Sequence, residues 1–195
     1  MTRPRFRTDG LLTRPLIGAR ISAALGAIPS GARVLDVGCG LTDLASRLPS
    51  YVGCDRWEEV LEENRRRHPC ARFLAWDVLA SEAPEDVRAA GPYDAILMLA
   101  LLEHLADPAA ALRRAATLLA PGGRVVVTTP HPVGHAPLEA GAALGLLSRH
   151  AAEEHDALLG RAELAAAGET AGLALAAYRR FLLGLNQLAV FERKA

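Results

Sequence analysis

Short apolar runs alternate with segments of helical spacing along the first two thirds of the chain. Strand-like apolar runs occupy residues 33–37, 51–55, 72–76, 93–99 and 124–129. Helical spacing predicts a leading helix over about 11–27 and further helices over 42–48, 57–67 and 108–119. A polar connector covers 80–91, and the Pro-Gly-Gly turn at 121–123 precedes the fifth strand. This alternation predicts an α/β fold with a mainly parallel sheet and helices on both faces.

The pattern changes after Thr129. Prolines and glycines make an irregular loop, which an alanine-rich helical hairpin follows over about 138–159. A further helix is expected over 161–171, and strands over 173–181 and 187–193 form a terminal hairpin. We expect one domain over 1–195, in which residues of about 130–160 form a helical lid insert.

The segment VLDVGCGLTD, residues 34–43, carries the most specific chemistry. Gly38 and Gly40 remove the side chains from the turn after the first strand, so that a small molecule can contact the backbone. A dinucleotide-binding turn needs a third glycine where Asp43 stands, and this acid would repel a pyrophosphate. S-adenosylmethionine instead carries a sulfonium and an ammonium group, which Asp36 and Asp43 suit on charge grounds.

This segment resembles the first motif of the class I S-adenosylmethionine-dependent methyltransferases, D-x-G-x-G-x-G, with Thr42 in place of the last glycine. LEHLADP at 102–108 and LLAPGGRVVVTTP at 118–130 look like two further family segments, and GLNQL at 184–188 is similar to the last hairpin of some members. The resemblance implies a Rossmann-like, doubly wound sheet of about seven strands. In this fold an antiparallel seventh strand lies between strands five and six.

Ligands of open α/β sheets bind at the carboxyl ends of the strands, where further candidates lie. Asp55 ends the second strand, where it can accept hydrogen bonds from both ribose hydroxyls or cap the next helix. Arg56 can stack on the adenine or simply be exposed. The resemblance places Asp77 against the adenine amino group, the Val78 amide against a ring nitrogen and Leu99 along the methionine portion. The alternatives are a plain loop aspartate and core packing.

Methyl transfer requires alignment of the reactants and exclusion of water, and a base only where the acceptor must lose a proton. His131, directly after the fifth strand, is the first candidate base, and His135 and His155 lie in the expected lid. The leading helix offers Arg14 or Arg20 for the carboxylate of the cofactor.

The LEH segment provides the second catalytic candidate, His104, beside Glu103. Some relatives carry an acid three residues before this glutamate, which gives a potential Glu/Glu/His metal cluster. Here Ala100 occupies that position, and two adjacent ligands are too few, so we predict no metal site. In the alternative reading, Glu103 caps a helix and His104 packs over the sheet.

Composition limits the partners of the chain. Lys plus Arg and Asp plus Glu number 22 each, so net charge gives no indication of nucleic-acid binding. The three cysteines lack metal spacing, and neither a signal peptide nor an apolar run of about 18 residues is present. We therefore expect a cytoplasmic protein without a membrane span.

The predicted activity is S-adenosylmethionine-dependent methylation of an oxygen, nitrogen or carbon nucleophile of a small molecule. A noncatalytic S-adenosylmethionine-binding protein with a partner-binding lid is the main alternative, and an NAD-dependent oxidoreductase is a weaker one. The identity of the acceptor and the oligomeric state are left open.

Overall fold

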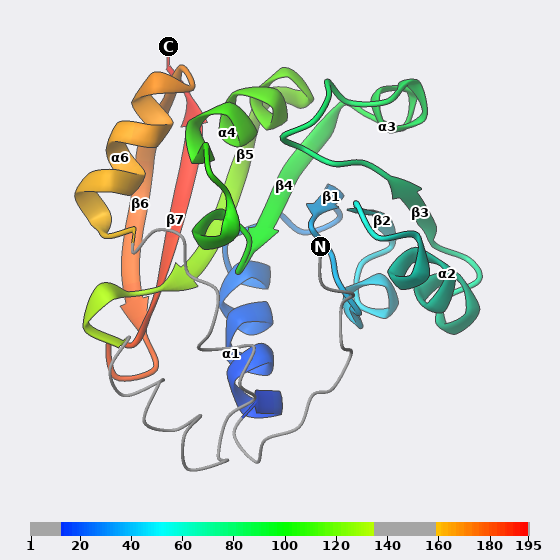
Figure 1. Cartoon of the computed structure of the whole chain (residues 1–195), viewed down its shortest axis with the longest axis horizontal. Coiled ribbons are helices and arrows are strands. Elements are labelled where there is room, and N and C mark those ends of the chain that lie inside the picture. The colour runs from blue at the N-terminus through cyan, green and yellow to red at the C-terminus, as the bar shows by residue number, and fades with distance from the viewer. Residues whose placement is uncertain (1–12, 135–158, 195) are drawn as a thin grey trace.

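A seven-stranded sheet organises residues 13–134 and 159–194, the part of the chain that the computed structural model describes (Figure 1). Its order is β3-β2-β1-β4-β5-β7-β6. All neighbouring strands are parallel except β7, which is antiparallel to both β5 and β6. The expected sheet and the insertion of the seventh strand are therefore confirmed. The strands are β1 Arg33–Val37, β2 Ser50–Asp55, β3 Arg72–Ala75, β4 Tyr93–Leu99, β5 Leu119–Pro130, β6 Leu173–Phe181 and β7 Asn186–Arg193.

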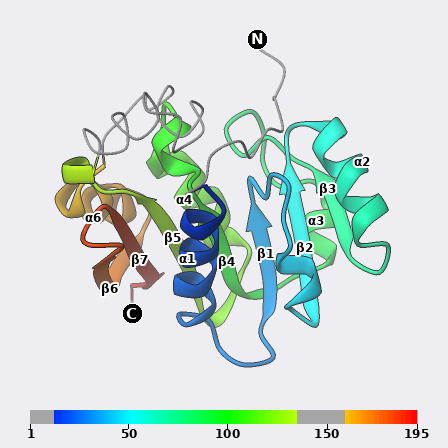
Figure 2. The same ribbon diagram turned by 90° about the horizontal axis from the view of Figure 1, so that it is seen from below.

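Helices cover both faces of this sheet, as the alternating pattern predicts (Figures 1 and 2). One apolar core packs the first face against α1 (Thr13–Leu25) and α2 (Glu58–Arg67). A second core packs the other face against α3 (Glu85–Ala89), α4 (Pro108–Thr117) and α6 (Arg161–Thr170). No helix among the described residues is both long and apolar enough to cross a membrane.

The alternation along β5 shows how one strand serves both cores. Val125 and Val127 are fully buried in the core of α4 and α6, whereas Val126 lies in the core of α1. β4 and β5 are parallel neighbours, so their carboxyl ends lie at the same edge of the sheet (Figure 1). This edge is where residues from distant parts of the sequence meet.

Several predicted boundaries were wrong. The helix expected over 42–48 is only a 3-10 turn, Leu44–Ser46, and the next residues lead into Pro49, which a continuing helix does not accommodate. β5 begins at Leu119, before the Pro-Gly-Gly turn, because Leu119 already pairs with Tyr93 of β4; a register shift separates this pair from the next one, Ala95 with Arg124. The polar connector contains α3. The expected lid hairpin, with His135 and His155, lies outside the described residues.

Candidate active site

The turn after β1 lies at the carboxyl edge of the sheet, where the strand order reverses between β1 and β4. Gly38 and Gly40 have φ angles of +69° and +53°, a region that glycine adopts readily. A Cβ atom on Gly38 would lie 2.7 Å from Leu101 Cδ1, so a larger residue there would also have to displace the Leu101 side chain. A Cβ atom on Gly40 would meet nothing within 4 Å. The turn therefore leaves open space on the Cβ side of Gly40.

Helix α2 holds this turn through a buried amide. The Asn64 side chain is completely buried; its Nδ2 donates to the Gly40 carbonyl at 2.6 Å and its Oδ1 accepts from the Thr42 amide at 3.3 Å. His68 Nε2 lies 2.9 Å from the Thr42 carbonyl. The sequence analysis missed Asn64, although an amide three positions after buried Leu61 is an unusual residue on an apolar helix face.

A second support reaches the turn from β2. Tyr51 Oη donates to Asp36 Oδ2 at 2.8 Å, and Gly53 makes room for it, since a Cβ there would lie 3.0 Å from the Tyr51 oxygen. Burial raises the pKa of Asp36 to about 7; the Tyr51 hydrogen bond lowers it and the neighbouring Asp55 adds to the rise. This buried carboxyl group titrates close to neutral pH.

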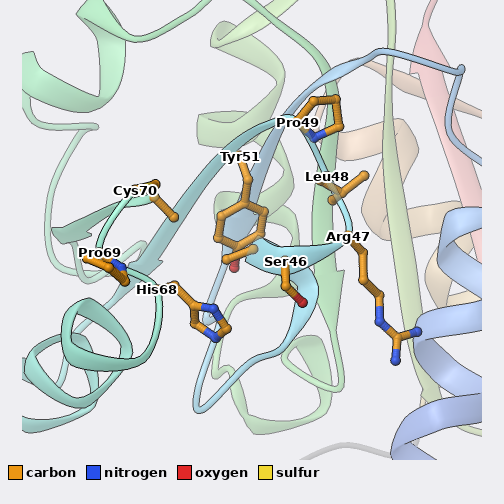
Figure 3. A pocket seen from close by; sticks show the side chains of 10 residues that line it. Ser46, Arg47, Leu48, Pro49, Tyr51, His68, Pro69 and Cys70 are labelled. Atoms are coloured by element: carbon orange, nitrogen blue, oxygen red, sulfur yellow. The ribbon is translucent and has the colours of Figure 1, made fainter.

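A surface pocket of about 570 Å³ lies behind these supports (Figure 3). The loop after the 3-10 turn and the loop after α2 line it, together with Tyr51 at the start of β2. Tyr51 and His68 both belong to the pocket wall and both bond to the segment that carries the glycines. None of the residues predicted from the sequence to bind cofactor or to act in catalysis lines this pocket, so it is separate from the strand-end site.

Asp55 connects the end of β2 to the same turn. Its Oδ2 accepts from the Gly40 amide and its Oδ1 from the Trp57 amide, both at 3.0 Å. Each carboxylate oxygen retains a further lone pair, so these contacts leave acceptor capacity for a ligand. Arg56 stacks on the Trp57 ring, with Cζ 4.8 Å from the ring centroid. The stacking predicted for this arginine is thus made with its neighbour in the chain.

The segment after β3 forms a tight local turn. Asp77 Oδ1 accepts from the backbone amides of Leu79 and Ala80, at 3.0 and 3.3 Å. Val78 is buried, and its carbonyl accepts a hydrogen bond from Arg114. Asp77 is therefore held in place at the strand end, with its second carboxylate oxygen outside this turn.

The end of β4 carries an unusual backbone conformation. Leu99 is half-buried, and the next residue, Ala100, has a φ angle of +54°, a region that residues with a Cβ rarely adopt. The Ala100 amide donates to the Thr128 carbonyl of β5 at 2.7 Å, which fixes this conformation. Such strain is concentrated at functional sites of proteins.

The two candidate catalytic histidines differ in environment. His131 is half-buried after β5, where its Nδ1 accepts a hydrogen bond from the Val133 amide at 3.2 Å. In the neutral ring this contact requires the proton on Nε2. Burial, and then the charge of Arg180, lower the pKa of His131. His104 is exposed at the end of the 3-10 turn Leu102–His104.

Of the two arginines considered on the leading helix, Arg14 is exposed and Arg20 is half-buried. Arg20 Nε donates to Asn186 Oδ1 of β7 at 2.8 Å. Its side chain is therefore directed across the edge of the sheet. Among the described residues, no group of three or more His, Cys, Asp or Glu side chains could hold a metal ion.

A family model described as a methyltransferase domain matches residues 12–178. The chain therefore belongs to the methyltransferase domain family, and the resemblance predicted from the sequence is confirmed.

Curated relatives named ubiquinone biosynthesis O-methyltransferase match part of the chain. The protein from Aeromonas salmonicida (strain A449) is 33% identical over 151 residues, which are 73% of this chain and 63% of that protein. The protein from Xanthomonas axonopodis pv. citri (strain 306) is 38% identical over 106 residues, which are 52% of this chain and 44% of that protein. The matched region thus spans about half of the length of these relatives.

Solved structures show the same fold. An S-adenosylmethionine-dependent methyltransferase from Mesorhizobium loti aligns with a TM-score of 0.70 and 18% identity, covering 90% of this chain and 98% of that chain. Magnesium protoporphyrin IX methyltransferase from Synechocystis PCC 6803, with bound SAH, aligns with a TM-score of 0.62 and 18% identity. This alignment covers 100% of this chain and 90% of that chain. At these identities the likeness establishes the Rossmann-like methyltransferase fold.

Replacement of the buried amide tests its role as the support of the glycine turn. Asn64→Ala removes both of its hydrogen bonds to the turn and leaves buried backbone groups unpaired, so the free energy of unfolding should fall by about 1–3 kcal/mol. Urea denaturation measures this change. Glu62→Ala, on the exposed side of α2, is the control and should stay within about 0.5 kcal/mol of wild type. Equal effects of the two variants would contradict the assignment.

Asp36 should make the ligand-free protein less stable as the pH rises. Its pKa in the folded state, about 7, lies above the ordinary value of 3.8, so the folded state binds this proton more tightly than the unfolded state. Its stabilising contribution is complete below the ordinary value and is lost as the pH approaches 7. Asp36→Asn should flatten this slope in unfolding experiments across the window. Tyr51→Phe, which removes the opposing hydrogen bond, should extend the slope to higher pH; identical slopes for all three proteins would refute the assignment.

Proposed function

We propose that the chain binds S-adenosylmethionine at the glycine turn and transfers its methyl group to a hydroxyl oxygen of a small molecule. The observation that supports the proposal most directly is the hydrogen bond that links the turn after β1 to the end of β2. There, Asp55 accepts a hydrogen bond from the amide of Gly40, a residue with open space at its Cβ position. Membership of the methyltransferase family makes S-adenosylmethionine the cofactor.

The residues at this edge fit that cofactor. A glycine without neighbours at its Cβ position leaves room for the ligand, and the free lone pairs of Asp55 suit two ribose hydroxyls. Asp77 and Val78 are assigned to the adenine, Leu99 to the methionine portion, and Arg56 to the rim beside the adenine. Asp36, with its raised pKa, adds negative charge near the turn as it ionises. When bound, the cofactor supplies an activated methyl group on a sulfonium.

The loss of the third motif glycine has a structural explanation. Thr42 is buried, its hydroxyl accepts from the Leu44 amide at 3.0 Å, and its own amide donates to Asn64. A threonine at this position therefore stabilises the turn. This supports an intact cofactor site. The alternative, a noncatalytic binding protein, predicts cofactor binding without turnover on any acceptor.

The assignment of an oxygen acceptor is supported by the relatives, whose names describe O-methyltransferases. The chain contributes alignment and exclusion of water, which are the main requirements of methyl transfer. The contact from the Val133 amide to Nδ1 keeps the proton of the neutral His131 ring on Nε2, so a role of Nε2 as general base would require the other tautomer. A single domain, a cytoplasmic location and the absence of nucleic-acid partners stay predictions.

Removal of the Asp55 carboxylate tests the cofactor site. Asp55→Ala deletes charge-assisted hydrogen bonds, each contributing about 1.5–3 kcal/mol, and should weaken S-adenosylhomocysteine binding at least about tenfold. Isothermal calorimetry measures the dissociation constant, and NAD should not bind. Glu59→Ala, which removes an exposed carboxylate of α2, is the control and should leave the dissociation constant unchanged. An unchanged constant in Asp55→Ala would move the ribose contact elsewhere.

The catalytic roles are tested by single-turnover methyl transfer once an acceptor is known. We expect His131→Ala to retain the rate within about threefold, whereas loss of a general base would lower it about 10²-fold or more. Turnover should also survive chelation. Abolition by a chelator and restoration by a divalent ion would contradict the metal-free assignment and return Glu103 and His104 to the centre of the site.

A further inference from the structure

Four polar side chains from four different elements lie on the α1 side of the sheet near its carboxyl edge. Arg20 comes from α1, Glu103 from the 3-10 turn after β4, Thr128 from β5 and Asn186 from β7. Thr128 follows Val126 by two residues, and Asn186 precedes Leu188 by two, so each shares a face of the sheet with its apolar neighbour. Val126 and Leu188 both pack in the core of α1. The hydrogen bond from Arg20 to Asn186 joins the helix to the sheet. We name these four residues the edge cluster.

The edge cluster holds buried polar atoms that lack partners. Thr128 and Asn186 are 0% exposed and Glu103 is 2% exposed. Within residues 13–134 and 159–194, Glu103 Oε2, Thr128 Oγ1 and Asn186 Nδ2 have no hydrogen-bond partner. An unpaired buried polar group is costly, and folded proteins contain few of them. These three atoms of the edge cluster therefore leave hydrogen-bonding capacity for an incoming polar group.

The charges of the edge cluster select a neutral ligand. Burial raises the pKa of Glu103, whereas Arg20, and to a smaller extent His104 and a backbone hydrogen bond, lower it. Burial likewise lowers the pKa of Arg20, against the attraction of Glu103. Across the described residues no ion pair within 4 Å joins the two, although each influences the other. One cation and one anion cancel, so an additional full charge would be unfavourable there.

The surroundings of the edge cluster place it beside the reacting end of the site. Thr128 lies opposite Leu99 of β4 and Leu188 of β7 in the register of the sheet. Leu99 is the residue assigned to the methionine portion of the cofactor. Apolar side chains thus flank the unpaired polar atoms. A matching ligand combines a small polar group with an apolar body.

We propose that the edge cluster binds the acceptor hydroxyl, and that the acceptor is a neutral molecule with this hydroxyl on an apolar body. A hydroxyl has one donor and two lone pairs, which complement an unpaired carboxylate oxygen and an unpaired amide N–H. Its proton is donated to Glu103 Oε2 and its oxygen accepts from Asn186 Nδ2, while the Thr128 hydroxyl completes the polar wall. This inference rests on the proposed function, since it assigns the acceptor part of the same site.

Phenol is the probe, because it is a small rigid molecule with one hydroxyl on an apolar ring. NMR titration of the protein saturated with S-adenosylhomocysteine follows the Asn186 side-chain amide and the Arg20 Nε–H directly. We expect phenol to shift both signals. Toluene has a similar size but no hydroxyl, and it should bind at least about tenfold more weakly, the loss expected when a charge-assisted hydrogen bond is removed. Benzoate should also bind at least about tenfold more weakly, because it brings a full negative charge to the edge cluster.

Two variants and a control separate binding from folding. Thr128→Val should weaken phenol binding about threefold and Glu103→Gln about tenfold or more, with S-adenosylhomocysteine affinity unchanged. Thr128→Val removes an unpaired hydroxyl and should keep or raise Tm. Thr129→Val, the neighbouring position, removes a hydroxyl that accepts from Gln187 at 2.9 Å, so it should lower Tm and leave phenol binding intact.

The outcomes distinguish this inference from the function on which it rests. Phenol bound no better than toluene, or bound equally by wild type, Thr128→Val and Glu103→Gln, overturns the edge cluster as the hydroxyl site. A wild-type protein that fails to bind S-adenosylhomocysteine overturns the proposed function itself. Selective phenol binding that both variants weaken, with normal S-adenosylhomocysteine binding, supports both.

Discussion

The carboxylate of Asp55 is the contact on which the proposed site depends. It ends β2, yet it accepts from the amide of Gly40 in the turn after β1, so it fixes the separation of two neighbouring strand ends. The side-chain amide of Asn64, on α2, donates to the Gly40 carbonyl of the same turn, and the Tyr51 hydroxyl, on β2, donates to Asp36. These supports leave the Cβ side of Gly40 open. The backbone is thus rigid where a ligand would need it and open where the ligand would lie.

The centre of the sheet and its carboxyl edge bury different kinds of side chains. Its central strands are apolar on both faces, and polar residues are buried mainly toward the carboxyl edge. Folding therefore derives most of its stability from the two cores, while the edge retains groups whose hydrogen bonding is incomplete. The strained backbone of Ala100 belongs to the same edge. Stability and recognition are thereby assigned to different parts of one sheet.

The sequence predicted those parts of the molecule that depend on local pattern. Strand ends follow from apolar runs, which is why Gly38, Gly40 and Asp55 were placed at the correct edge. The role of Asn64 and the burial of Asn186 depend on contacts between distant segments, which no local pattern reveals. The tautomer of a histidine cannot be predicted from local sequence either, because the position of the ring proton depends on the group that the ring contacts in the folded protein.

The contact between Arg20 and Asn186 joins residues 166 positions apart. By contrast, the turn, its acids and the supports Tyr51, Asn64 and His68 all lie within residues 36–68. During synthesis the glycine turn and its supports therefore emerge early, whereas the edge cluster is complete only after β7 has left the ribosome and inserted between β5 and β6. The glycine turn and its supports are therefore synthesised well before β7, the strand that brings Asn186 to the edge cluster.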